Sequence, residues 1–184
     1  MYRLTRFCRL CLNKKIKIAF KLSKIPLGEK YFFNKNKAQK QKKFPQTIGW
    51  CPKCNNVQVM EIINNKLLWQ DYTYLSSQTE AILKHFANFT KKTLKRFKLN
   101  KNDLIIDIGS NDGSLLKAFK KSKKKIRVLG VEPAKNVAQL AEKKNIKTLN
   151  KFFDFNLSKL INKKFKKAKI ITCFNTFAHS ENLR

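Results

Sequence analysis

The stretch Leu104–Ser114, with the sequence LIIDIGSNDGS, constrains the fold more than any other part of the chain. Its leucine and isoleucine run ends at Asp107 and is followed by Gly109 and Gly113. Such a run is typical of a buried parallel strand, and the glycines indicate a tight turn that leads into a helix. In α/β folds a turn at the carboxyl end of a strand is where nucleotide-like ligands bind. We therefore predict a ligand-binding loop over residues 107–113.

Strands and helices alternate after this loop, which predicts an α/β fold with a parallel sheet. We predict further strands over residues 126–131, 146–149 and 168–174, with a helix over residues 134–144 and an amphipathic helix before the first strand. Glu132 follows the second strand, at the position where such folds bind ribose hydroxyls. A surface carboxylate at the end of a strand is the alternative interpretation of Glu132.

The chain ends at Arg184, shortly after the predicted fourth strand. Four strands form only the N-terminal half of a doubly wound sheet, and the fourth strand would remain an exposed edge. The sequence therefore predicts a fragment or a truncated gene product, and we expect such a chain to be poorly stable and inactive alone.

Four of the five cysteines form two C-x-x-C pairs, Cys8 with Cys11 and Cys51 with Cys54. Each pair places two sulfurs on one side of a metal, so the two pairs together predict a tetrahedral structural zinc site. Disulfides are the alternative, and they are less favoured in a reducing cytoplasm. The fifth cysteine, Cys173, lies within a predicted strand and is expected to be a buried, inert thiol.

The net charge of +31 raises the question of a nucleic-acid partner. The excess is almost all lysine, with six arginines, and it is spread along the chain among Asn, Ile and Phe. Dispersed lysine favours a solvated surface over a nucleic-acid interface. Because the N-terminus lacks an apolar signal region and no run is long enough to cross a membrane, we expect a cytoplasmic monomer without a membrane partner.

The segment Trp69–Ser77 contains Tyr72 and Tyr74, which lie on one face if the segment is extended. Aromatic packing and a role in a site are both open interpretations of these two residues. Ser77, followed three residues later by Glu80, predicts a capping box at the start of the next helix.

The order of these motifs resembles a family of sugar C-methyltransferases that act on nucleotide-linked keto-deoxysugars. Asn111 and Ser114 replace glycines of the dinucleotide fingerprint, and Asp107-x-Gly109-x-Asn111-x-Gly113 resembles the first motif of class I methyltransferases that use S-adenosylmethionine (SAM). The remaining landmarks occur in order over nearly the whole chain: Cys8-x-x-Cys11, Pro26-Leu27, Cys51-x-x-Cys54, Val57-Gln58, Tyr72-x-Tyr74-x-Ser76-Ser77, Gly130–Ala134, Phe152-Phe153 and Asn175-x-x-Ala178-His179.

The resemblance implies a structural zinc-binding domain over residues 1–68, a substrate-contacting segment and helical connector over 69–100, and an incomplete Rossmann-like class I methyltransferase domain over 101–184. Its cofactor is SAM and its substrate is a nucleotide-linked keto-deoxysugar. The implied cofactor-binding residues are Asp107, Gly109, Asn111, Gly113, Glu132, Phe153 and Asn175, and the implied catalytic residues are Tyr74 and His179. The chemistry is proton removal next to a sugar ketone and attack of the resulting enolate on the sulfonium methyl group, with the main base expected beyond Arg184.

Two rival functions remain open at this point. The same zinc and cofactor motifs suit a methyltransferase with another acceptor, because the acceptor pocket changes more readily than the cofactor loop. A protein of another class, a non-catalytic zinc module that binds nucleic acid through its charge, would concentrate that charge in one stripe, which the sequence does not show.

Overall fold

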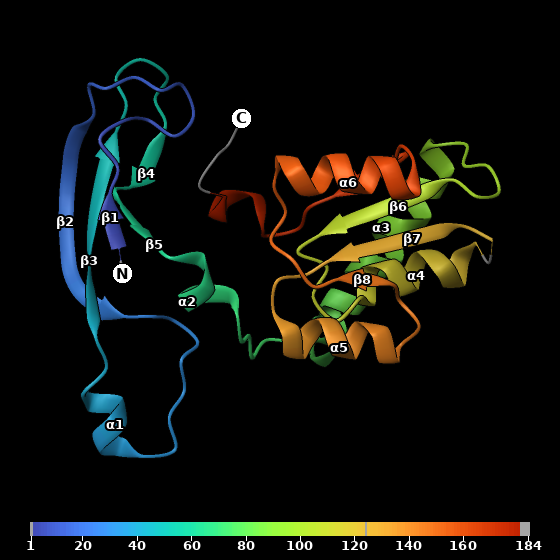
Figure 1. Ribbon diagram of the computed structural model, residues 1–184, viewed down its shortest axis with the longest axis horizontal. Helices are drawn as coiled ribbons and strands as arrows, with labels where there is room; N and C mark the ends of the chain where they lie inside the picture. Colours follow the sequence, from blue (N-terminus) through green and yellow to red (C-terminus); the bar gives the residue numbers. More distant parts are fainter. Residues whose placement is uncertain (1, 124, 181–184) are drawn as a thin grey trace. The chain divides into compact units, whose positions relative to one another are not determined.

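The computed structural model describes residues 2–123 and 125–180 and divides into two compact units. One unit extends to Leu68 and includes His179 and Ser180, and the other is Trp69–Ala178. Both are shown in Figure 1. Among the described residues, no helix combines the length and the apolar character that a membrane crossing requires.

The N-terminal unit is built from two small antiparallel sheets (Figure 1). β2, β3 and β4 form one sheet in that order, and β1 pairs with β5. The bounds are β1 Tyr2–Leu4, β2 Lys17–Pro26, β3 Lys43–Trp50, β4 Val57–Val59 and β5 Glu61–Ile63, with the short helices α1 Lys35–Gln39 and α2 Asn65–Trp69.

Few apolar side chains stabilise the interior of this unit. Every residue of β2 is exposed, including Ile18, Phe20 and Leu22. The buried apolar side chains are those of Cys8, Phe44, Cys51, Met60 and Ile62. The two sheets therefore depend on contacts other than a large hydrophobic core.

Strand pairing and helix capping decide the structure of two stretches in this unit. β2 continues through Pro26, because the strand pairs with β3 up to Lys43. The polar stretch after Asn34 contains α1, since the Asn34 side chain accepts a hydrogen bond from the Lys37 N–H at 3.1 Å and caps the helix.

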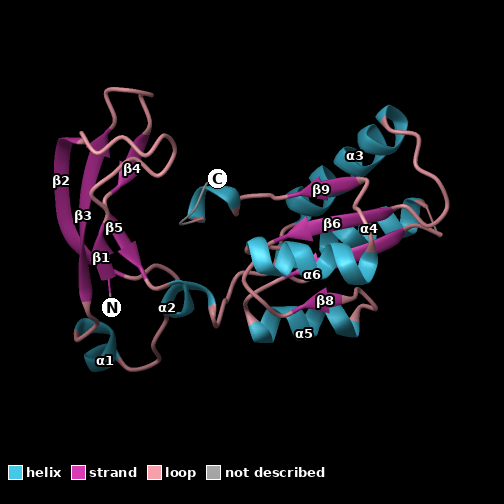
Figure 2. Cartoon of the chain, turned by 45° about the horizontal axis from the view of Figure 1, so that its top comes forward, coloured by secondary structure: helices cyan, strands magenta, loops and turns pink. Residues whose placement is uncertain are grey.

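The second unit is an α/β sandwich around a four-stranded parallel sheet (Figure 2). The strand order is β8-β7-β6-β9, so the first strand in sequence is central, as in doubly wound folds. The bounds are η1 Ser76–Gln78, α3 Glu80–Arg96, β6 Leu104–Ile108, α4 Ser114–Ser122, β7 Arg127–Val131, α5 Lys135–Lys143, β8 Thr148–Leu149, α6 Phe155–Phe165, β9 Ile170–Thr172 and η2 Phe177–His179. The predicted Rossmann-like α/β fold is confirmed.

Alternate residues of β6 enter opposite cores, which explains its continuous apolar sequence. Ile105 packs with side chains of α3, α4 and α5 on one face of the sheet. Leu104 and Ile106 pack with α6 on the other face. Helices thus cover both faces of the strand that carries the glycine loop, and they fix where that loop begins.

The outer strands β8 and β9 are shorter than predicted. The N–H of Ile146 donates to the carbonyl of Ala141 at 3.0 Å, so Ile146 belongs to the turn that ends α5 and β8 begins later. β9 pairs with β6 alone over Ile170–Thr172, and Ile171 is exposed. Cys173 follows β9 and is half-buried, which corrects the expectation of a buried thiol inside the strand.

Candidate functional site

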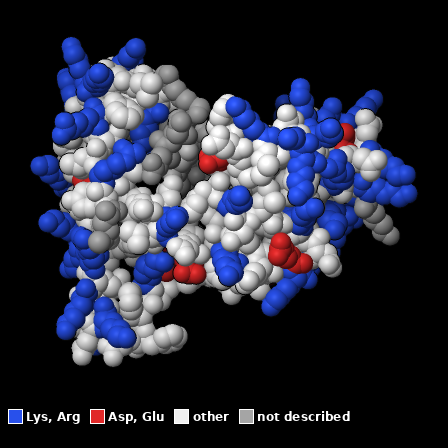
Figure 3. All heavy atoms as spheres, in the orientation of Figure 1, with Lys and Arg blue, Asp and Glu red and all other residues white. Residues whose placement is uncertain are grey.

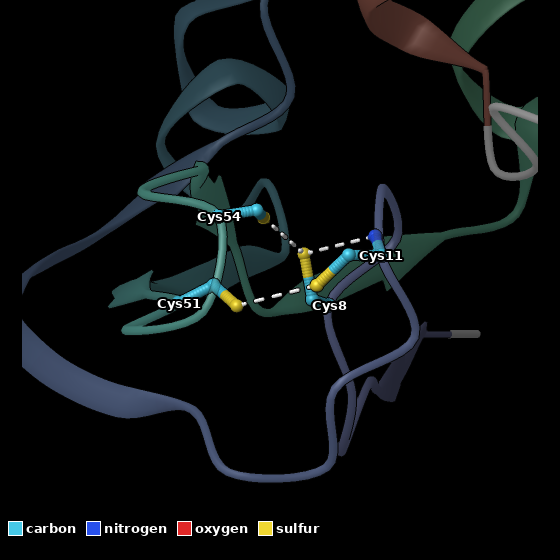
Figure 4. Close-up of side chains that lie close together, drawn as sticks. All are labelled: Cys8, Cys11, Cys51 and Cys54. Carbon is cyan, nitrogen blue, oxygen red and sulfur yellow. Dashed lines mark hydrogen bonds between the residues drawn. The ribbon is translucent and has the colours of Figure 1, made fainter.

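The four cysteine side chains of the two C-x-x-C pairs converge on one point (Figure 4). Their sulfurs all lie within 4.8 Å of one another, with 3.6 Å between Cys8 and Cys54 and 3.5 Å between Cys11 and Cys51. Four thiolates bound to zinc at about 2.3 Å stand about 3.8 Å apart in a tetrahedron. A disulfide needs about 2.05 Å, so the spacing fits a metal centre.

The two cysteine loops repeat the same backbone hydrogen bonds. In the first, the Leu12 N–H donates to the Cys8 carbonyl at 2.9 Å and the Cys8 N–H donates to the Asn13 carbonyl at 2.8 Å. In the second, Asn55 and Asn56 make the equivalent two bonds with Cys51, each at 2.9 Å. Leu12 and Asn55 both adopt positive φ, near 60°. The two loops therefore share one hydrogen-bonded shape, and each presents two sulfurs.

An asparagine of each loop donates to a cysteine sulfur of the other loop. The Asn13 Nδ2 donates to Cys51 Sγ at 3.6 Å, and the Asn56 Nδ2 donates to Cys8 Sγ at 3.7 Å. Both asparagines occupy the same place in a C-x-x-C-x-N pattern that occurs twice. These donors were not predicted from the sequence, although the repeated pattern is a signal for them.

The electrostatics of the cluster also suit a cation. Burial opposes ionisation of Cys51, but hydrogen bonds from Asn13 and from backbone N–H groups outweigh it and lower its pKa to about 6. The Asn56 backbone N–H favours the Cys54 thiolate, yet burial and the other three cysteines raise the pKa of Cys54 to about 12. Without a cation the four thiols cannot all ionise, whereas a bound divalent metal compensates their charge.

We expect the double variant Asn13→Ala/Asn56→Ala to bind zinc about 10- to 100-fold more weakly than the parent protein. The reason is that the buried sulfurs of Cys8 and Cys51 each lose a hydrogen bond that stabilises their thiolate form. Competition with a chromogenic chelator measures the affinity. Asn36→Ala, an exposed asparagine of α1, is the matched control. Equal affinities for the parent and the double variant would contradict this role.

The glycine loop after β6 is shaped by left-handed backbone at three positions. Gly109, Asn111 and Gly113 have φ values of 70°, 49° and 75°. The N–H groups of Gly109 and Ser110 both donate to the Val131 carbonyl, at 2.8 and 3.2 Å. These bonds hold the loop at the carboxyl ends of β6 and β7, where ligands bind in such sheets.

Gly109 cannot carry a side chain without disturbing the loop. Besides its positive φ, a β-carbon at this position would collide with the side chain of Thr176. We expect Gly109→Ala to lower the free energy of unfolding of the second unit by about 1–3 kcal/mol. Urea titration followed by far-ultraviolet circular dichroism measures this. Gly28→Ala is the control, since no atom lies within 4 Å of its added β-carbon. Equal effects of the two substitutions would contradict the steric argument.

Two buried carboxylates lie at the ends of neighbouring strands beside this loop. Asp107 of β6 accepts a hydrogen bond from Thr172 Oγ1 at 2.7 Å. Glu132 follows β7 and accepts the N–H groups of Asn111 and Ala134, each at 2.9 Å. Glu132 is therefore a buried residue that holds the loop, which removes its interpretation as a surface carboxylate. Together the two buried acids form a site whose ionised form suits a cationic ligand.

Burial raises the pKa of Asp107 to about 7, although the Thr172 hydroxyl opposes the rise and Glu132 adds to it by charge repulsion. Burial likewise raises the pKa of Glu132, against the effect of its two backbone donors. Desolvation thus makes both acids costly to ionise, and the charge of Glu132 adds to this cost at Asp107. A positive ligand beside them would lower both pKa values.

The predicted capping role of Ser77 is wrong. Helix α3 begins after Thr79, which makes no side-chain capping bond. Residues Ser76–Gln78 instead form the 3-10 turn η1, and the Ser77 N–H donates to Asp112 Oδ2 at 3.2 Å. This hydrogen bond joins residues 76–78 to the glycine loop, and it sets their conformation, whereas no capping box forms.

The tyrosines before this turn lie together. The rings of Tyr72 and Tyr74 make an edge contact with centroids 6.4 Å apart, and Trp69 packs on Tyr72 at 5.5 Å. Tyr74 is partly exposed, and its carbonyl accepts the Asn111 amide at 3.0 Å. The structure thereby brings Tyr74 next to the predicted cofactor loop.

The other predicted site residues are less closely connected. Phe153 is partly exposed in the segment after β8, and Asn175 is an exposed residue with a φ of 51° after β9. His179 ends η2 and is grouped with the N-terminal unit. Their roles stay predictions.

A protein-family model matches the N-terminal segment of the chain. Residues 8–69, which include all four clustered cysteines, match the methyltransferase family described as “Putative zinc binding domain”. The predicted zinc-binding character of the N-terminal segment is confirmed by this match together with the cysteine geometry.

The match to one relative extends over more of the chain than the family model does. The C-methyltransferase NovU of Streptomyces niveus is 25% identical over 172 residues, which are 94% of this chain and 40% of NovU. The chain thus spans less than half the length of this relative.

The solved structures that match have lower sequence identity to this chain. The plantazolicin methyltransferase BpumL in complex with SAH is 21% identical, with a TM-score of 0.44, over 59% of this chain and 42% of its own. The YcgJ protein from Bacillus subtilis is 17% identical, with a TM-score of 0.35, over 49% of this chain and 37% of its own.

Proposed function

We propose that this chain binds SAM and belongs to a SAM-dependent methyltransferase with a structural zinc domain. The observation that carries the proposal is the pair of buried acids, Asp107 and Glu132, beside a left-handed loop at the carboxyl ends of β6 and β7. The similarity to NovU over almost the whole chain supports it. SAM would supply the methyl group for transfer.

The residues of the loop suit the charges and hydroxyls of this cofactor. Each oxygen of Glu132 uses one lone pair on a backbone N–H and keeps another for a ribose hydroxyl. Asp107 lies at the register position next to Gly130. A β-carbon at residue 130 would collide with the side chains of Ser110 and Thr148, so glycine there lets Ser110 of the loop pack against β7. The negative charge of Asp107 favours the cationic methionine end. Phe153 and Asn175 are proposed as weaker contacts.

We propose a carbon atom of a nucleotide-linked keto-deoxysugar as the methyl acceptor. The name of NovU and the family resemblance of the sequence support this choice. In this proposal the phenol of Tyr74 assists proton transfer or holds an enolate oxygen, and His179 orients the sugar. The cofactor loop would serve another acceptor equally well, so this part of the proposal stands separately from SAM binding.

Basic side chains do not form a stripe on the visible surface. On the face shown in Figure 3, lysine and arginine are scattered among uncharged residues. This distribution gives no support to the rival proposal of a nucleic-acid module.

Calorimetry with SAM tests the cofactor assignment, and it should reveal a dependence on pH. Below pH 7 the buried Asp107 is protonated in the free protein, so binding of a cation must release a proton. We expect the affinity for SAM to rise with pH up to about 7 and then level off. Titration in two buffers of different ionisation enthalpy counts the released protons.

The raised pKa of Asp107 also makes the stability of the free protein depend on pH. Asp107 binds its proton more tightly when folded, so its contribution favours the folded state at low pH and is lost as pH rises from 3.8 towards about 7. Asp107→Asn should remove both this loss of stability and the proton release. Absence of SAM binding by the parent chain would reject the proposed function, and pH-independent binding would reject the role of Asp107.

A further inference from the structure

The backbone of the tyrosine segment is held by side chains from the cofactor half of the second unit. Asn136 of α5 accepts the Tyr72 N–H at 3.3 Å and donates to the Tyr72 carbonyl at 2.8 Å. Asn111 accepts the Ser76 N–H at 2.8 Å and donates to the Tyr74 carbonyl at 3.0 Å. Each asparagine side chain therefore makes two hydrogen bonds to the backbone of the segment, as a neighbouring strand would do in a sheet.

Asn111 joins this segment to the glycine loop through its own main chain. Its N–H donates to Glu132 Oε2 at 2.9 Å, while its side-chain amide points to the tyrosine segment. A φ of 49° is costly for a residue with a β-carbon and free of cost for glycine. Compared with glycine, the asparagine side chain adds the two hydrogen bonds to the backbone of residues 74 and 76.

The neighbouring Asp112 strengthens the same connection. Its side chain is fully buried and accepts the Ser77 N–H at 3.2 Å, the Ser114 hydroxyl at 2.6 Å and Lys144 Nζ at 2.7 Å. Hydrogen bonds from Lys144, Ser114 and Ser77 lower its pKa in spite of burial, so it accepts these bonds as a carboxylate. Asn111 and Asp112, which are adjacent in the loop, therefore accept the N–H groups of Ser76 and Ser77, which are adjacent in the tyrosine segment.

We infer that Asn111 is a positioning residue that carries Tyr74 on the cofactor loop: the main chain of Asn111 shapes the loop, and its amide fixes residues 74–76 to it. The inference rests on the proposed function, because the loop is taken to bind the cofactor. It changes the predicted role of the Asn111 side chain from a cofactor contact to a coupling between cofactor binding and the position of Tyr74. Ordering of the loop by a ligand then also orders the segment that bears Tyr74.

Hydrogen exchange of the 184-residue chain, with S-adenosylhomocysteine (SAH) as the probe, tests this coupling without an acceptor. Asn111→Gly keeps the left-handed backbone and removes the amide. In the ligand-free protein it should speed exchange of the Ser76 N–H about tenfold. In the parent, SAH should slow exchange at Ser76, and in Asn111→Gly this response should disappear while SAH affinity stays within about threefold.

Asn136→Ala is the matched variant, because it removes the two bonds to Tyr72 and leaves those of Asn111. It should keep the SAH response at Ser76, and unchanged exchange within β6 should show that both variants fold. A retained SAH response in Asn111→Gly would overturn the inference. A loss of SAH affinity above about thirtyfold in that variant would also overturn it, because the side chain would then be a ligand contact. Failure of SAH to bind the parent would instead reject the proposed function.

Discussion

Removal of zinc is expected to unfold the N-terminal unit, since a bound structural zinc contributes roughly 10 kcal/mol or more to the folding of such modules. Among the described residues of the unit, five apolar side chains are buried, two of which are the zinc-site cysteines Cys8 and Cys51, and its longest strand β2 is exposed throughout. We expect one zinc per chain after purification without chelator. Excess chelator should abolish the folded signal of this unit and leave the α/β unit folded.

The fluorescence of Trp50, next to Cys51, measures this unfolding in a Trp69→Phe background, because the chain has two tryptophans. Cys51→Ser should reproduce the effect of the chelator. Cys173→Ser is the control, since this cysteine lies outside the cluster. A unit that keeps its Trp50 signal and its cooperative unfolding without metal would contradict a structural zinc.

Truncation of Glu132 to alanine is expected to weaken SAM binding about 100-fold. Two charge-assisted hydrogen bonds to ribose hydroxyls are worth about 3 kcal/mol together, which corresponds to that factor. The substitution also leaves the N–H groups of Asn111 and Ala134 without their acceptor, so the loop loses its fixed shape. Calorimetry measures the affinity, and urea unfolding checks that the variant folds.

Glu132→Gln and Glu142→Ala separate these effects. Glutamine keeps the shape of the side chain and one carbonyl oxygen, so we expect a loss of affinity near tenfold. Glu142 lies on the exposed face of α5, and its truncation should leave SAM affinity unchanged. Equal SAM affinities of Glu132→Ala and Glu142→Ala would disprove the ribose contact.

The sequence predicted the features that depend on local pattern. The apolar run before Gly109 is a central strand buried on both faces, and the two C-x-x-C pairs meet in one cluster. Both follow from residue types at fixed spacing, which short-range geometry decides. The long strands β2 and β3 were missed, because their pairing brings together residues far apart in the chain and buries little of β2.

The sequence did not predict which polar side chains bind which backbone groups. Ser77 matched a capping pattern, but Asp112 offers its amide a buried carboxylate, and this tertiary partner outweighs the local one. Asn111 was predicted to face a cofactor, yet its amide binds the backbone of residues 74 and 76. These partners lie 35 or 37 residues apart in the chain, and no local periodicity encodes such separations.

The repeated cysteine loops have a consequence for the order of events during synthesis. The first loop leaves the ribosome about forty residues before the second, and it offers a metal two sulfurs and no cross-loop amide donor. A single loop is therefore a weak, exchangeable ligand for zinc, whereas both together close the coordination sphere. The nascent segment should remain open until Asn56 has emerged, and metal capture then joins the two loops just before β4 and β5 follow to complete the two sheets.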